Sequence, residues 1–126
     1  MNSQLRHVFD WLAVFVWMGI IYYFSNQPDL KSALEPAWDY VLRKGAHFLE
    51  YFVLCYLLYR AIRGHDAPLV PSLLISVFAA VAYAISDEWH QGWVSGRVAS
   101  PVDVSIDTLG VLACAALLFR RNHNQR

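Results

Sequence analysis

The residues of this chain that are best suited to chemistry are acids and histidines placed at the ends of long apolar runs. The stretch SDEWHQ, residues 86–91, directly follows a run from Ala67 to Ile85 that contains no charged residue. A histidine flanked by carboxylates can exchange a proton near neutral pH. An arginine or lysine close by can hold a phosphate or carboxylate group. The pattern therefore points to acid–base chemistry or anion binding at the end of an apolar segment.

Similar residues share one face on each of three predicted helices. Because an α-helix turns by about 100° per residue, positions three or four apart lie on the same side. The shared faces carry, in chain order, Lys44, His47, Glu50 and Tyr51, then Tyr83, Asp87, His90 and Gln91, and finally Asp103 and Asp107. Glu88 lies about 100° away from the second of these faces. Below the two aspartates, Gly110 and Cys114 continue the same stripe, and small residues there allow a neighbouring helix to approach closely.

The composition indicates that the elements carrying these residues cross a membrane. Of the 126 residues, 57% are hydrophobic and 16% are charged, whereas soluble domains carry about 25% charged residues. A spanning helix needs roughly 20 mainly apolar residues, and four apolar runs approach or reach this length. We therefore predict an all-α fold, an antiparallel bundle of four transmembrane helices in a single domain, 1–126. The expected helices cover about 8–24, 44–62, 67–90 and 102–120, and a soluble helical bundle is the alternative.

An antiparallel bundle would bring the three polar faces to one membrane surface. The start of the second helix, the end of the third and the start of the fourth meet there, joined by Ser25 and Gln27 from the end of the first. The segment Ser25–Asp29 is expected to end the first helix, and the stretch that follows it, up to Tyr40, to lie along the outer surface, where a short interfacial helix is one conformation open to it. Charges at membrane depth cost about 2.5–3.5 kcal/mol each on insertion scales, so we expect them to pair, bind a ligand or line a wet cavity. Five acids would meet three cations and two histidines, namely Glu50, Asp87, Glu88, Asp103 and Asp107 with Arg43, Lys44, Arg97, His47 and His90.

The distribution of cations predicts the orientation in the membrane. With four spans, one side of the membrane holds Arg6, Arg60, Arg63, Arg120, Arg121 and Arg126, and the other holds Lys31, Arg43, Lys44 and Arg97. The positive-inside rule then places both termini in the cytoplasm and the polar cluster on the outer face. The formal net charge of zero gives no indication of nucleic-acid binding.

Three segments resemble a known family. KGAHFLEYF, SDEWHQGWVSGR and DVSIDTLG, spaced as they are here, are similar to the VanZ-like membrane proteins, over about Tyr22 to Leu118. That family is named for a protein associated with reduced susceptibility to the glycopeptide teicoplanin. The resemblance implies a small multi-pass protein of the bacterial cell membrane, but no particular reaction. It implies a site made of His47, Glu50, Tyr51, Asp87, Glu88, His90, Gln91, Arg97, Asp103, Asp107 and Gly110.

Three functions are compatible with these residues. In an enzyme, His90 with Asp87 or Glu88 is the first acid–base pair, His47 with Glu50 is the second, and Gln91, Asp103 and Asp107 complete the catalytic candidates. Lys44, Tyr51 and Arg97 would bind the substrate, a membrane lipid or lipid-linked envelope precursor. In a binding protein the same cluster would hold an amphiphile without turnover, and in a scaffold it would be a structural hydrogen-bond network. No cofactor is required, although His47, Glu50, Asp87 and His90 are suitable ligands for a divalent metal.

Overall fold

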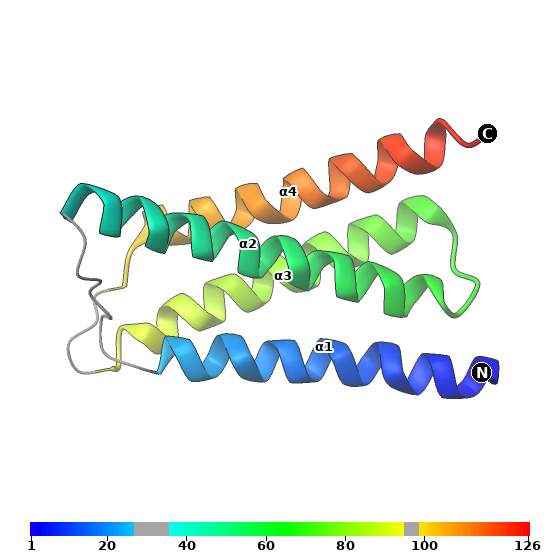
Figure 1. The fold of residues 1–126 in the computed structure, drawn as a ribbon, viewed down its shortest axis with the longest axis horizontal. Helices are drawn as coiled ribbons and strands as arrows, with labels where there is room; N and C mark the ends of the chain where they lie inside the picture. The colour runs from blue at the N-terminus through cyan, green and yellow to red at the C-terminus, as the bar shows by residue number, and fades with distance from the viewer. Residues whose placement is uncertain (27–35, 95–98) are drawn as a thin grey trace.

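The computed structural model describes residues 1–26, 36–94 and 99–126, and these residues form four α-helices and no strand (Figure 1). The helices are α1 (Ser3–Ser25), α2 (Pro36–Arg63), α3 (Leu69–Gln91) and α4 (Pro101–His123). Consecutive helices run in opposite directions, so both termini lie at one end of the bundle and α2 runs parallel to α4 (Figure 1). The predicted all-α, four-helix architecture is confirmed.

Three of the four helices are long and apolar enough to cross a membrane. They are α1, α3 and α4, each 23 residues long, with mean hydropathies of 1.6, 2.1 and 1.9 over their most apolar windows. The 28-residue α2 does not reach that hydropathy, since it carries six charged side chains, Asp39, Arg43, Lys44, Glu50, Arg60 and Arg63. It packs against all three other helices. Its polar residues can therefore contact protein instead of lipid.

The apolar residues divide between a small core and a large outer surface. Val14, Leu54, Ala80 and Val111, one from each helix, are among the fully buried core residues. Large apolar side chains cover the outside, and Phe78 on α3 is 77% exposed. A water-soluble bundle would bury such side chains, whereas a lipid-facing surface leaves them outside. This surface favours the membrane bundle over the soluble alternative.

α2 and α4 come unusually close at Gly110. A Cβ atom at this position would clash with the backbone carbonyl of Phe48 on α2. Only a glycine permits this approach, as the small-residue stripe below the aspartates predicted. The close contact sets the register between the two helices that carry most of the polar residues.

The start of α2 differs from the prediction. The helix begins at Pro36 and not near residue 44, so residues 36–40 belong to α2 and form no separate interfacial helix; residues 27–35 lie outside the described part of the chain. Asp39 lies in the first turn and pairs with Arg43 at 3.1 Å. An acid near the helix start and an ion pair one turn apart both stabilise a helix. The prediction missed this turn because it followed the apolar run alone.

Candidate functional site

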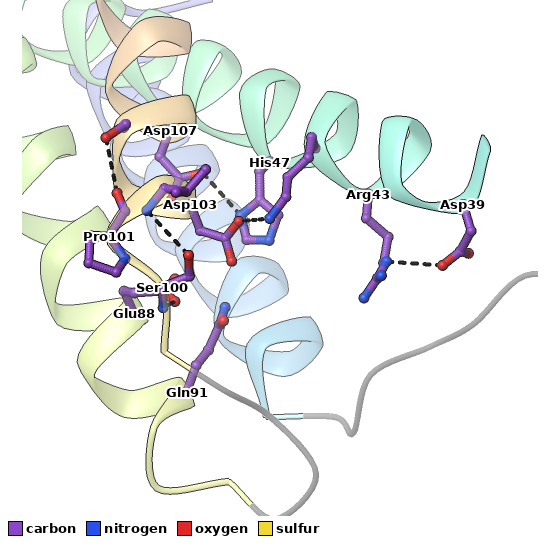
Figure 2. A network of polar contacts seen from close by, with 12 residues as sticks. Asp39, Arg43, His47, Glu88, Gln91, Ser100, Pro101, Asp103 and Asp107 are labelled. Atoms are coloured by element: carbon purple, nitrogen blue, oxygen red, sulfur yellow. Dashed lines mark hydrogen bonds and ion pairs between the residues drawn. The ribbon is translucent and has the colours of Figure 1, made fainter. Parts of the chain in front are cut away.

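Polar side chains from three helices meet at the end of the bundle where α2 and α4 begin and α3 ends (Figure 2). We call this group the polar cluster. The cluster consists of Lys44, His47 and Tyr51 on α2, Asp87, Glu88 and Gln91 on α3, and Asp103 and Asp107 on α4. All eight are among the residues proposed from the sequence.

Two contacts connect α2 to α4, one helical turn apart. Lys44 forms an ion pair with Asp103, and His47 Nδ1 lies 3.0 Å from Asp107 Oδ1. α2 and α4 run in the same direction. One turn further along α2 therefore meets one turn further along α4, and the second contact lies directly beyond the first. Figure 2 shows His47 pointing toward Asp107, with Asp103 one turn away on the same helix.

The His47–Asp107 pair has the geometry of a base oriented by a carboxylate. The Asp107 side chain is 1% exposed, while the His47 side chain is 15% exposed. A carboxylate that accepts the Nδ1 proton holds the ring in one tautomer and leaves Nε2 to exchange a proton. Among the described residues, Nε2 has no hydrogen-bond partner, and neither does the buried Asp107 Oδ2.

The adjacent acids of α3 point to different helices. Asp87 accepts a hydrogen bond from the Tyr51 hydroxyl of α2 at 3.1 Å and one from Gln91 at 3.5 Å. Glu88 Oε1 accepts a hydrogen bond from the backbone N–H of Ser100, the residue that caps α4. The second oxygen of Glu88 is buried, without a hydrogen-bond partner in the described part of the chain. Asp87 therefore connects α3 to α2, and Glu88 connects α3 to α4.

Both predicted histidine pairs are replaced by others. His90 lies on the side of α3 that faces α1, where Nε2 is 3.2 Å from Asn26 Oδ1 and the ring stacks on Tyr22 at 4.9 Å. His90 consequently bonds to neither Asp87 nor Glu88. His47 pairs with Asp107 instead of Glu50 because the close α2–α4 contact brings that aspartate alongside it.

Arg43 lies away from its expected place, whereas Glu50 stays near His47. Glu50 is half-buried, and its backbone carbonyl accepts a hydrogen bond from Trp17 of α1 at 2.9 Å. Arg43 pairs with Asp39 on its own helix, away from the cluster (Figure 2). Arg97, the predicted anion-binding residue, lies outside the described residues.

The metal ligands suggested from the sequence do not assemble. Within residues 1–26, 36–94 and 99–126, no group of three or more histidine, cysteine, aspartate or glutamate side chains is placed to hold a metal ion. The reason lies in the packing, because His90 turns toward α1 while His47 turns toward α4.

Ser100 is a site residue that the sequence reasoning overlooked. Its hydroxyl accepts a hydrogen bond from Val102 N–H at 3.2 Å, and its own N–H donates to Glu88. A serine followed by proline at the start of a helix is a recognisable N-cap signal. That signal locates the start of α4, although it does not reveal the bond to Glu88.

Comparison with known proteins identifies a family. A family model described as VanZ/LLP1 matches residues 9–121, a range that includes the whole polar cluster. No curated protein and no solved structure matches the chain significantly.

Proposed function

This chain belongs to the VanZ/LLP1 family, and on that premise we propose that its polar cluster binds, and exchanges a proton with, the headgroup of a lipid or lipid-linked envelope precursor. The protein would thereby lower the susceptibility of a bacterial cell to teicoplanin, as the family name implies. Its place would be the cell membrane, with both termini in the cytoplasm and the cluster at the outer face.

The observation that carries the proposal is the His47–Asp107 pair. A partly exposed imidazole backed by a buried carboxylate at 3.0 Å is suited to accept and return a proton. A purely structural histidine would be expected to use both ring nitrogens, whereas Nε2 of His47 has no hydrogen-bond partner among the described residues. This nitrogen is therefore available to a hydroxyl or ammonium group of a substrate.

The position of the cluster suits a headgroup. It lies where α3 ends and α4 begins, so it is near one surface of the membrane that these helices can span. Trp89 and Trp93, near the same end, are 72% and 77% exposed. Tryptophan is enriched at the boundary between lipid and water, where headgroups are found.

The other members of the cluster would position the substrate. The buried oxygens Glu88 Oε2 and Asp107 Oδ2 can each accept one more hydrogen bond. Lys44, already paired with Asp103, adds positive charge at the edge of the site. A substrate hydroxyl that donates its hydrogen bond to Nε2 of His47 would give its proton to that nitrogen, while these oxygens would accept hydrogen bonds from other donor groups of the same headgroup.

A structural network is the second candidate, and a specific observation favours it. Tyr51 is completely buried and bonds to Asp87, and Glu88 bonds to the residue that caps α4. Interhelical hydrogen bonds of this kind fix the geometry of a membrane bundle. These two contacts can hold the site together whether or not it performs chemistry.

The two histidines allow a matched test. In cells that depend on the protein for teicoplanin tolerance, His47→Gln should abolish tolerance at unchanged protein abundance, because the base is lost. His90→Gln should retain tolerance, because this ring contacts α1. If His47→Gln loses abundance together with tolerance, and a stabilised background restores both, the cluster is a scaffold and the proposal fails.

A further inference from the structure

A second polar site lies at the opposite end of the bundle, where α1 begins and α2 ends (Figure 1). A pocket of about 400 Å³ opens there, lined by Arg6, His7, Asp10, Arg63, Gly64 and Asp66 among others. We call it the basal pocket. None of its residues belongs to the polar cluster.

Tertiary contacts between α1 and the α2–α3 turn shape the basal pocket. The His7 and His65 rings stack at 4.5 Å, and Trp11 Nε1 donates a hydrogen bond to His65 Nε2 at 3.1 Å. A Cβ atom on Gly64 would lie 2.8 Å from His7 Nδ1, so a glycine is required for the ring to take this position. The pocket is therefore a packed feature of the fold.

The charges within the basal pocket favour an anion. Asp10 forms an ion pair with Arg60, whose Nε lies 2.8 Å from Asp10 Oδ1. Arg63 donates to the carbonyl of Ala67, which fixes its guanidinium at the pocket. Arg6 forms no ion pair with any residue that the structure describes.

One buried donor or acceptor in the basal pocket is also unused. His7 Nδ1 is buried and has no hydrogen-bond partner within the described ranges. Asp66 lines the pocket as well, but it is exposed to solvent on the turn. Two arginines thus line a cavity whose partly buried acid, Asp10, is already paired with Arg60.

We propose that the basal pocket binds a phosphate group through Arg6 and Arg63. Guanidinium groups suit phosphate because they offer two parallel hydrogen bonds. α1 begins beside the pocket and is apolar enough to span a membrane, so in a bilayer the pocket would lie near the lipid phosphates. An anionic lipid and free inorganic phosphate are the two sources of this group. The site goes beyond the proposed function and does not depend on which way the protein faces.

The test compares two arginines at the same end of the protein. Full-length protein in detergent is titrated with short-chain phosphatidylglycerol, and separately with inorganic phosphate, while its melting temperature is followed. Binding of either ligand should raise the melting temperature. Arg6→Gln should increase the apparent dissociation constant by about fivefold, because one basic residue near a lipid surface typically contributes about 1 kcal/mol. The control is Arg121→Gln, an exposed residue in the last turn of α4 that does not line the pocket.

The outcomes distinguish a phosphate site, a lipid site and no specific site. A saturable gain with both ligands that Arg6→Gln weakens identifies phosphate itself as the ligand, and a gain with phosphatidylglycerol alone identifies the lipid. Absence of any saturable gain in the unaltered protein would overturn the proposal. Equal weakening by Arg121→Gln would also overturn it, because the binding would then be diffuse attraction to a basic surface. Arg6 is exposed near the start of a helix, where a cation does not stabilise the fold, so Arg6→Gln should fold normally.

Discussion

Tyr51 of α2 donates its hydroxyl hydrogen to Asp87 of α3 at 3.1 Å, and both side chains are buried. The bond joins two helices at the depth of the polar cluster. It also connects an acid of the apolar α3 to the more polar α2, whose own hydropathy does not indicate a spanning helix. Contacts of this kind explain how α2 can lie among three apolar helices.

Removal of this hydroxyl should destabilise the bundle modestly. Tyr51→Phe keeps the ring but leaves Asp87 without one of its donors, and interhelical hydrogen bonds in membrane proteins contribute about 0.6–1.7 kcal/mol. Unfolding by SDS titration in mixed micelles measures the loss of free energy. The control is Tyr56→Phe, an exposed tyrosine on the same helix. Equal effects of both changes would show that the Tyr51–Asp87 bond does not stabilise the fold.

The charge of Asp107 should matter for function more than for stability. Asp107→Asn retains the shape and an acceptor for His47, but it removes the negative charge that would stabilise the protonated ring. We expect a loss of activity of about tenfold or more, measured as teicoplanin tolerance at equal abundance. Asp39→Asn is the matched control, since its ion pair with Arg43 lies outside the polar cluster. Full tolerance with Asp107→Asn would contradict an acid–base role for the pair.

Substitution of Gly110 should separate α2 from α4. A methyl group at this position clashes with the Phe48 carbonyl, and overpacking of this kind costs about 1–3 kcal/mol. The same SDS titration should therefore show a large loss of stability for Gly110→Ala. Gly45→Ala is the control, because a Cβ atom at Gly45 meets no other atom within 4 Å. If the two variants are equally stable, α2 and α4 are not in close contact at Gly110.

The proposed orientation can be tested by chemical labelling. Trp93 and Arg126 are exposed at opposite ends of the bundle, and both native cysteines are buried, which keeps background labelling low. In right-side-out membrane vesicles, an impermeant maleimide should label Trp93→Cys at once. It should label Arg126→Cys only after permeabilisation, because the cation distribution places the C-terminus inside. The reverse result would put the polar cluster on the cytoplasmic face.

The sequence was sufficient to predict the fold class and the family. Apolar runs of spanning length identify α1, α3 and α4, because the thickness of a bilayer sets the length of such helices. Helical periodicity identified which polar residues share a face, and the alternation of direction identified the end of the bundle at which the faces meet. These rules are local, so they hold without knowledge of how the helices pack.

Only the tertiary structure decided which side chains are partners. Periodicity places His47 and His90 at the correct end but does not determine which neighbour each ring faces. That choice depends on the rotation and register of whole helices, which are set by contacts such as Gly110 against Phe48. The close approach there brings Asp107 to His47, while His90 is left facing Asn26 and Tyr22 of α1. Pairing across helices is a property of packing between segments distant in sequence, and no local pattern encodes it.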